Sequence, residues 1–309
     1  MKLISIVTAC YNEEENIREI YEQVKLVFRE LPQYRYEHIF IDNASEDKTV
    51  EILKSIAAED KNVKVIVNAR NFGHIRSPFY GLLQAQGDAV ISIVADLQDP
   101  PELIKDFIKK WEEGFKIVVG VKPKSKEGWF MSSLRKTYYN FVTKIAEAPL
   151  VKNFTGFGLY DKSVMNILRE LGDPYPYFRG LIAEIGFPIT EISYVQPRRQ
   201  HGTTKNNFYT LFDMAVLGIT SNSKIPIRIM SIAGFVLSFV SFATAIIFLI
   251  LKLLFWQYFT VGLAPILIGV FFFSSVQLFF IGMIGEYIGA IHTQVLKRPL
   301  VIEKERINF

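Results

Sequence analysis

Three oxygen-bearing side chains, Asp96, Gln98 and Asp99, occur within four residues of one another. Carboxylate and amide oxygens are the ligands that a hard divalent cation such as Mg²⁺ or Mn²⁺ prefers. They come directly after the apolar segment 90–94, which has the composition of a buried strand. Ligands of open α/β sheets bind at the edge where such strands end. The spacing predicts a cation site held by Asp96 and Gln98, and a solvated turn is the structural alternative.

Apolar and helical segments alternate through the first 121 residues. Buried strands are expected at 3–9, 38–41, 63–67, 90–94 and 116–121, and helices at 14–30, 49–58, 77–86 and 101–113, with Gly87 as a helix C-cap. Strict β/α alternation with apolar strands is typical of a doubly wound, mostly parallel α/β sheet. The polar loops after the first four strands would then meet at one edge of the sheet.

This shared edge could hold a nucleotide. Tyr11 can stack on a base, Asp42 can accept a hydrogen bond from a ring N–H, and Asp96 can hold a cation against phosphates. The sequence has neither a Walker A run nor a Gly-x-Gly-x-x-Gly fingerprint. Phosphate charge would therefore be neutralised by the cation and by Lys or Arg side chains. Taken singly, Tyr11 could equally be a rim aromatic and Asp42 a turn former.

Four segments carry a more specific resemblance: LISIVTACYNEEENI at 3–17, FIDNASEDKT at 40–49, RNFGH at 70–74 and VADLQDPPE at 94–102. Together they resemble the family 2 inverting glycosyltransferases, whose GT-A fold is a Rossmann-like α/β domain. Within that family the chain is similar over essentially its whole length to the polyisoprenyl-phosphate glycosyltransferases, which include dolichol-phosphate mannose synthases and bactoprenol glucosyltransferases. The resemblance implies inverting transfer of a hexose, with UDP-glucose as the expected donor, to a polyprenyl phosphate, with Mg²⁺ or Mn²⁺ as cofactor.

The resemblance also implies roles for individual residues. It implies nucleotide-sugar contacts from Ala9, Tyr11, Glu13, Phe40, Asp42, Ala95 and Asp96, and metal coordination by Asp96 and Gln98. One position departs from the family pattern. The family usually has Asp-x-Asp in this loop, whereas this chain has Val94, Ala95 and Asp96, so the first carboxylate is absent.

Two regions further along the chain could bind phosphates. Lys122 follows the expected strand 116–121, where the relatives carry a basic residue facing the diphosphate, and a surface lysine is the alternative. Ser132 and Arg135 lie in a segment of helical pattern, 128–139, beside aromatic residues. They could hold a lipid phosphate against a membrane, or belong to an ordinary solvated basic face.

The segment 153–161, NFTGFGLYD, is expected to be a glycine-broken turn. Many of the relatives place an aspartate there, near the acceptor, but Phe157 and Gly158 occupy that region in this chain. We therefore assign no general base. A lipid phosphate is largely ionised at neutral pH, because its second pKa is ~6, and its attack does not require a strong base.

Arg199 and Lys205 flank Gly202 in the segment 194–205, a spacing that resembles the family's mobile loop over the donor phosphates. Arginine binds phosphate through two parallel hydrogen bonds and lysine binds it as a point charge, so both would stabilise a diphosphate leaving group. Arg199 and Lys205 are thus expected to act in catalysis together with Asp96. The alternative is a basic stretch beside a membrane, attracted to anionic headgroups.

The C-terminal third of the chain has the composition of a membrane anchor. Half of all residues are hydrophobic, 26 are Phe, and the mean hydropathy is positive. The segments 229–251 and 262–285 lack Lys and Arg and are long enough to cross a hydrocarbon core of about 30 Å. The domains expected are a glycosyltransferase domain at 1–205, an interfacial helix at 206–224, a transmembrane hairpin at 225–296 and a cytoplasmic tail at 297–309. Lys and Arg flank both outer ends of the hairpin, which predicts that the catalytic domain and both termini are cytoplasmic.

Composition also limits the classes of molecule that the protein is expected to bind. A net charge of +4 without a concentrated basic stripe does not favour a nucleic-acid binder, and the single cysteine, Cys10, excludes an intramolecular disulfide. A lone two-helix hairpin buries little surface, so a homo-oligomer in the bilayer is expected. Two other functions stay open. One is a processive polysaccharide synthase, although no Gln-x-x-Arg-Trp segment is present, and the other is a non-catalytic nucleotide-sugar-binding scaffold.

Overall fold

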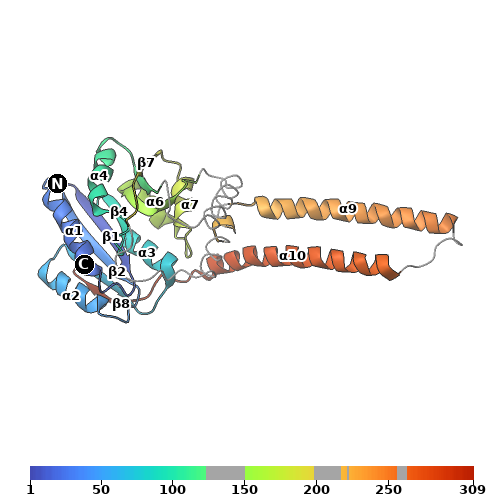
Figure 1. Cartoon of the computed structure of the whole chain (residues 1–309), viewed down its shortest axis with the longest axis horizontal. Coiled ribbons are helices and arrows are strands. Elements are labelled where there is room, and N and C mark those ends of the chain that lie inside the picture. The colour runs from blue at the N-terminus through green and yellow to red at the C-terminus, as the bar shows by residue number, and fades with distance from the viewer. Residues whose placement is uncertain (123–149, 198–216, 221–222, 256–262) are drawn as a thin grey trace.

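The computed structural model describes residues 1–122, 150–197, 217–220, 223–255 and 263–309. They form an α/β domain and a long two-helix hairpin that extends away from it (Figure 1). The interfacial helix expected at 206–224 lies largely outside the described residues.

The described residues of the domain form one eight-stranded sheet in the order β7-β5-β6-β4-β1-β2-β3-β8. The strands are β1 (Leu3–Cys10), β2 (Arg35–Asp42), β3 (Val63–Asn68), β4 (Ala89–Val94), β5 (Ile117–Val121), β6 (Phe154–Asp161), β7 (Ile189–Ser193) and β8 (Glu303–Ile307). Strands β4, β1, β2 and β3 are mutually parallel, and β5 is parallel to β7. Strand β6 is antiparallel to both of its neighbours, and β8 is antiparallel to β3. The prediction of a mostly parallel α/β domain is confirmed.

Helices cover both faces of the sheet. The domain helices are α1 (Ile17–Arg29), α2 (Thr49–Glu59), α3 (Gly73–Gln84), α4 (Ile104–Glu112), preceded by the 3₁₀ turn η1 (Pro101–Leu103), α6 (Lys162–Leu171) and α7 (Phe178–Glu184). One core cluster contains residues of α1, α2 and α4, and the other contains residues of α3, α6 and α7. Because successive residues of a strand face opposite sides, a central strand buries residues on both faces, and the apolar runs in β1, β3 and β4 and at 39–41 of β2 made these strands predictable.

Two glycines have roles that differ from the prediction. Helix α3 ends at Gln84, and Gly87 is not its C-cap. A Cβ atom at Gly87 would lie 2.6 Å from Ser5 Oγ, so the glycine is required by its close approach to β1. The segment 153–161 is strand β6 and not a turn. A Cβ at Gly158 would lie 2.5 Å from the Val118 carbonyl oxygen, so this glycine permits close strand packing.

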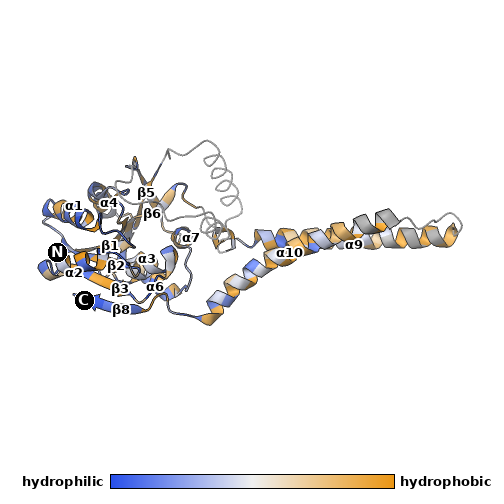
Figure 2. Cartoon of the chain, turned by 60° about the horizontal axis from the view of Figure 1, so that its bottom comes forward, coloured by the Kyte–Doolittle hydropathy of each residue, from blue (hydrophilic) through white to orange (hydrophobic). Residues whose placement is uncertain are grey.

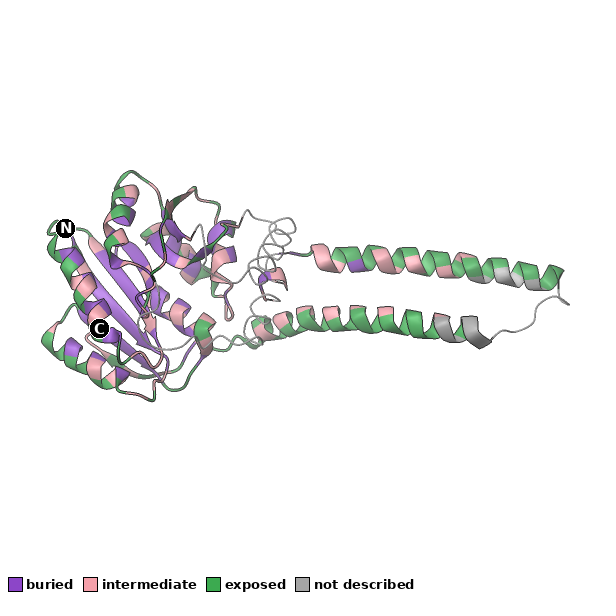
Figure 3. Cartoon of the chain, in the orientation of Figure 1, coloured by how far each residue is buried: buried purple, intermediate pink, exposed green. Residues whose placement is uncertain are grey.

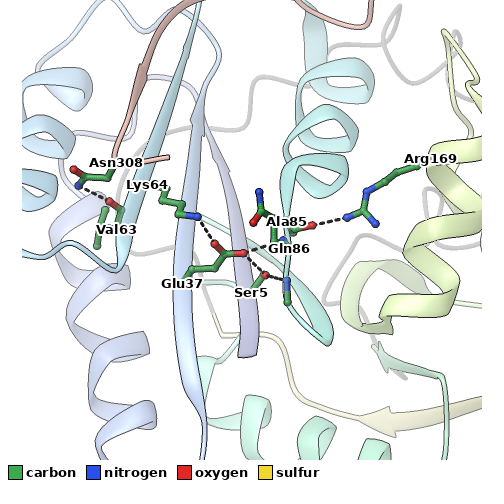
Figure 4. A network of polar contacts seen from close by, with 9 residues as sticks. Ser5, Glu37, Val63, Lys64, Ala85, Gln86, Arg169 and Asn308 are labelled. Atoms are coloured by element: carbon green, nitrogen blue, oxygen red, sulfur yellow. Dashed lines mark hydrogen bonds and ion pairs between the residues drawn. The ribbon is translucent and has the colours of Figure 1, made fainter. Parts of the chain in front are cut away.

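The tail predicted at 297–309 is not a separate segment, because its last part is the edge strand β8. Val65 of β3 pairs with Ile307, and Asn308 Nδ2 donates to the carbonyl of Val63 at 2.9 Å (Figure 4). Tyr80 of α3 donates to Glu303 at 2.9 Å. The chain therefore returns from the hairpin to the domain, and the hairpin is attached to folded structure at both ends.

A buried ionic network stabilises the end of the sheet opposite the polar loops (Figure 4). Glu37 accepts hydrogen bonds from Ser5 Oγ at 2.5 Å, from Lys64 Nζ at 2.6 Å and from the Gln86 backbone N–H at 3.0 Å. Burial raises the pKa of Glu37, but the hydrogen bonds from Lys64, Ser5 and Gln86 outweigh it and hold this pKa below its usual value. The network joins β1, β2, β3 and the segment before β4.

The hairpin consists of α9 (Ile225–Leu254) and α10 (Leu263–Leu296). Within them Ile225–Thr244 and Gly269–Leu296 are long and apolar enough to cross a membrane. Both helices are largely hydrophobic and mostly exposed along their length (Figures 2 and 3). Phe235, Phe239 and Phe271, for example, are 77%, 73% and 70% exposed. Apolar exposure on this scale is typical of a surface that contacts lipid or another chain.

Candidate active site

The polar loops after β1, β2, β3 and β4 begin side by side at one edge of the sheet. Cys10 pairs with Asp42, and Asp42 pairs with Val67. On the other side of β1, Ala9 pairs with Val94. These registers confirm that the loops share an edge, as the β/α alternation predicted.

Hydrogen bonds join the loops after β1 and β2. The backbone N–H of Asn12 donates to Ser45 Oγ at 2.8 Å, and that of Glu13 donates to Thr49 Oγ1 at 2.9 Å. Asn12 adopts a left-handed backbone with φ of 52°, which asparagine tolerates better than most residues. Tyr11 and Glu13 remain partly exposed on this edge, where a nucleotide could contact them.

Asp42 and Phe40 lie deeper than the nucleotide-binding prediction implied. Asp42 is fully buried and accepts hydrogen bonds from the N–H of Ser45 at 2.9 Å and from its hydroxyl. Burial raises the pKa of Asp42, and the Ser45 hydrogen bonds partly offset this. The ring of Phe40 is also fully buried and stacks on His38 at a centroid distance of 4.0 Å. The Phe40 side chain is therefore part of the core, and the contacts of Phe40 and Asp42 with a nucleotide stay predictions.

Asn43 organises the edge and was missed as a candidate from the sequence. Its Oδ1 accepts hydrogen bonds from Asn68 Nδ2 at 3.1 Å and from the Phe72 N–H at 2.9 Å. Its Nδ2 donates to Asn71 Oδ1 at 2.8 Å. A primary amide donates and accepts at once, and this property is the signal that could have identified Asn43 as the link to the RNFGH segment.

The Asp96 loop presents two oxygen ligands at the edge. Leu97 has a positive φ of 58° and is buried, whereas Asp96 and Gln98 on either side of it are partly exposed. Asp96 Oδ1 accepts a hydrogen bond from the Gln98 N–H at 3.1 Å, which closes a tight turn. Ala95 is buried, and Val94, in place of the family's first aspartate, is 43% exposed.

Asp99 lies deeper than the other two oxygen-bearing residues of the loop. It is buried, and its Oδ1 accepts a hydrogen bond from the Tyr194 hydroxyl at 2.6 Å. Burial raises the pKa of Asp99, and the Tyr194 hydrogen bond and the charge of Lys122 partly offset this. No group of three His, Cys, Asp or Glu side chains suited to a metal occurs in the described part of the chain. One carboxylate and one amide fit a Mg²⁺ or Mn²⁺ ion that takes its other oxygens from water and a diphosphate.

Lys122 lies at the end of β5, next to this loop. Its Nζ is 4.0 Å from Asp99 Oδ1 and 5.9 Å from the centroid of the Tyr194 ring. Phe157 packs edge-on against the Tyr194 ring, with the ring centroids 5.5 Å apart. Two aromatic rings therefore occupy the region where many relatives have an aspartate. The lysine is thus near the predicted cation site, and its contact with a diphosphate stays a prediction.

Two cavities extend from this edge toward the hairpin. The first, of about 220 Å³, is lined by Val94 and Asp99 and by residues of α3, β6 and α7. The second, of about 480 Å³, lies between α7 and α10 and includes Leu181 and Tyr287. Tyr177 lines both cavities. Tyr177 is therefore a lining residue common to the cavity at Val94 and Asp99 and to the cavity beside α10.

Four predicted site residues lie outside the described residues: Ser132, Arg135, Arg199 and Lys205. Their predicted roles in binding lipid phosphate and in stabilising the diphosphate stay predictions.

Residues 5–169 match the sequence profile of Glycosyl transferase family 2. The chain belongs to this family and is a glycosyltransferase. It is 36% identical over 299 residues to the uncharacterized glycosyltransferase YkcC of Bacillus subtilis, with 96% of this chain and 92% of the relative covered. It is 34% identical over 303 residues to the SfII prophage-derived bactoprenol glucosyl transferase of Shigella flexneri, with 98% and 97% covered. The resemblance seen in the sequence is confirmed.

Among solved structures the chain is similar to glucosyl-3-phosphoglycerate synthase from Mycobacterium tuberculosis in complex with Mn²⁺, UDP and phosphoglyceric acid. The TM-score is 0.48 at 19% identity, with 71% of this chain and 76% of that chain covered.

Proposed function

We propose that the protein transfers a hexose, glucose from UDP-glucose, to a polyprenyl phosphate at the cytoplasmic face of a membrane, with inversion of the anomeric carbon. The observation that carries this proposal is the pair of cavities that share Tyr177 and extend from the Asp96 loop to α10. In this proposal they would form a route between the nucleotide site and the membrane surface. The proposal is supported by end-to-end similarity to relatives named bactoprenol glucosyl transferase.

The donor would bind across the ends of β1, β2 and β4. Tyr11 would stack on the base, with Ala9, Glu13 and Ala95 beside it. Asp96 and Gln98 would hold Mg²⁺ or Mn²⁺, which neutralises diphosphate charge when bound. Lys122, together with Arg199 and Lys205, would stabilise the negative charge that develops on the departing nucleoside diphosphate.

The acceptor phosphate needs little activation by the protein. Its second pKa is ~6, so it is mostly a dianion at neutral pH. One phosphate oxygen forms a bond to the anomeric carbon while the bond from that carbon to the diphosphate breaks. A single displacement of this kind converts an α-linked donor into a β-linked product. Phe157 at the position of the relatives' aspartate is compatible with this scheme, because the protein would contribute positioning and not proton removal.

The membrane arrangement follows from charge and exposure. Lys224 and Arg228 lie at the start of α9, and Lys297 and Arg298 follow α10, so both domain-side ends of the hairpin carry positive residues. The positive-inside rule then favours a cytoplasmic domain with both termini on the same side. Because the hairpin exposes apolar surface along its length (Figure 3), we propose that copies of the chain associate in the bilayer.

A non-catalytic scaffold that binds a nucleotide sugar is the second candidate, since an exposed Val94 replaces a carboxylate at the edge. Purified full-length protein with Mg²⁺, undecaprenyl phosphate and UDP-glucose, UDP-N-acetylglucosamine or GDP-mannose in turn distinguishes the two. We expect undecaprenyl phosphate to gain one β-linked hexose from UDP-glucose, measured by mass spectrometry and by NMR of the anomeric proton. Donor binding without a lipid product would favour the scaffold, and a polysaccharide product would favour a processive synthase.

A further inference from the structure

A third cavity, of about 420 Å³, lies between the end of α10 and the segment before α7. Its walls include Pro174 and Tyr175 on the domain side and His292 and Leu296 of α10. It shares no lining residue with the two cavities that meet at Tyr177. It is therefore a separate feature from the candidate active site.

The cavity is lined by two arginines and a histidine. These are Arg76 of α3, Arg298 and His292 of α10, and none of the described residues lining the cavity is a carboxylate. Burial lowers the pKa of Arg76, the neighbouring positive charges of Arg70 and Arg298 lower it further, and Tyr175 partly offsets this. Arg76 and Arg298 thus repel one another, and no carboxylate of the described residues lines the cavity to offset the repulsion. An anion between them would relieve it.

The Arg76 side chain has hydrogen-bonding capacity left for such an anion. One of its terminal nitrogens donates to the Pro299 carbonyl oxygen, which attaches the chain after α10 to α3. Its Nε is buried and has no hydrogen-bond partner among the described residues. Guanidinium groups bind phosphate oxygens through paired N–H donors, so a cavity lined by Arg76 and Arg298 favours a phosphate among anions.

The position of the cavity indicates the source of the phosphate. His292, Leu296 and Arg298 lie at the domain-side end of the apolar segment Gly269–Leu296. If α10 crosses a bilayer, this end is at the level of the headgroups. Basic pockets beside membrane spans on the cytoplasmic side bind anionic lipid headgroups, while the exposed apolar surface of α10 can contact the acyl chains.

We propose that this cavity binds the phosphate of an anionic phospholipid, between Arg76, His292 and Arg298, at a site separate from that of the acceptor lipid. Such a lipid would connect α10 to α3. Helix α3 begins at Gly73, next to the Asn71 side chain that Asn43 holds at the candidate active site. The proposal depends on the membrane placement of α10 but not on the transfer reaction, since an inactive protein would still bind the lipid.

Native mass spectrometry of the full-length protein in neutral detergent tests the proposal. The protein is titrated with dioleoylphosphatidylglycerol, with dioleoylphosphatidylcholine and, in a separate arm, with inorganic phosphate. We expect one phosphatidylglycerol to bind about tenfold more tightly than phosphatidylcholine, because a charge-assisted hydrogen bond contributes about a factor of ten or more in affinity. Arg298→Gln should remove this preference for phosphatidylglycerol. Lys304→Gln removes the same charge from an exposed position of β8 and should leave the preference unchanged.

Arg76→Gln should act like Arg298→Gln, with folding checked by thermal unfolding because Arg76 also bonds to Pro299. If that variant does not fold, the exposed Arg298 decides the question alone. An equal preference for phosphatidylglycerol in wild type and Arg298→Gln would overturn the proposal. Binding of inorganic phosphate as tight as that of the lipid would assign the cavity to a soluble phosphate and overturn the lipid assignment.

Discussion

Tyr194→Phe removes the hydroxyl group that donates a hydrogen bond to Asp99, close to the Asp96 loop. That hydroxyl donates to the buried Asp99 at 2.6 Å, while Lys122 Nζ is 4.0 Å away, beyond hydrogen-bond distance. A hydrogen bond to an ionised group contributes about 1.5–3 kcal/mol, and a neutral one about 1 kcal/mol. We therefore expect the variant to lose about 2 kcal/mol of unfolding free energy when Asp99 is ionised and about 1 kcal/mol when it is protonated.

The pH dependence follows from the sign of the Asp99 shift. The pKa of Asp99 is raised in the folded protein, so folded Asp99 binds more protons than unfolded Asp99 between the unfolded pKa of ~3.9 and the higher folded value. Its contribution to stability falls as pH rises through that window. Loss of the Tyr194 hydrogen bond raises the folded pKa further. The stability difference between variant and wild type is therefore small near pH 4 and reaches its full size above the folded pKa.

Thermal unfolding of the full-length protein in detergent between pH 4 and pH 8 measures this difference. For a domain of about 200 residues, 2 kcal/mol corresponds to a fall in Tm of about 4–8 °C. Tyr160→Phe is the matched control, because the Tyr160 hydroxyl donates to the neutral Gly156 carbonyl at 2.8 Å. It should lower Tm by about 2–4 °C at every pH. A Tyr194→Phe deficit that equals the control and does not change with pH would refute the reasoning about Asp99.

Three further predictions concern the edge and the opposite end of the sheet. Asn43→Ala loses the hydrogen bonds to Asn68, Asn71 and Phe72 and should lower the unfolding free energy by about 2–3 kcal/mol. Asn62→Ala, at an exposed site, is the control and should lower it by about 0.5 kcal/mol or less. Thermal unfolding measures both changes. Asp96→Asn should remove most of the Mn²⁺-dependent rise in Tm that UDP produces, and a rise equal to that of wild type would exclude Asp96 as a ligand. Glu37→Gln should cost about 2 kcal/mol at pH 7. The pKa of Glu37 is lowered in the folded protein, so its stabilisation is present above the unfolded pKa of ~4.3 and is lost as pH falls through the folded pKa. The two proteins should therefore converge in Tm at a pH below the folded pKa of Glu37.

The central strands and the shared edge were predictable because their signals are local. Strands β1, β3 and β4 are largely buried and mostly apolar, β2 has the apolar run Ile39, Phe40 and Ile41, and each strand is followed by polar loop residues. Parallel β/α alternation then places those loops together. Asp96 and Gln98 could be selected as a pair for the same reason, since both lie in one loop at that edge.

The features that escaped prediction depend on residues distant in sequence. Asp99 is buried because Tyr194, 95 residues away, bonds to it. Strand β6 contains glycines that resemble turn formers, but Gly158 is required by close contact with β5. Strand β8 has the sequence EKERI, whose charged residues suit an exposed edge strand. Its pairing with β3 could not be read from this local pattern.

The most direct test of the account measures transfer of radiolabel from UDP-glucose to undecaprenyl phosphate, extracted into chloroform, for wild type, Asp96→Asn and Glu102→Gln. Glu102 is an exposed carboxylate just beyond the same loop and serves as the matched control. We predict labelled lipid from wild type and Glu102→Gln at similar rates, and at least about a hundredfold less from Asp96→Asn, as expected when a group that stabilises the leaving diphosphate is lost. Equal rates for all three proteins, or no labelled lipid from wild type, would contradict the account.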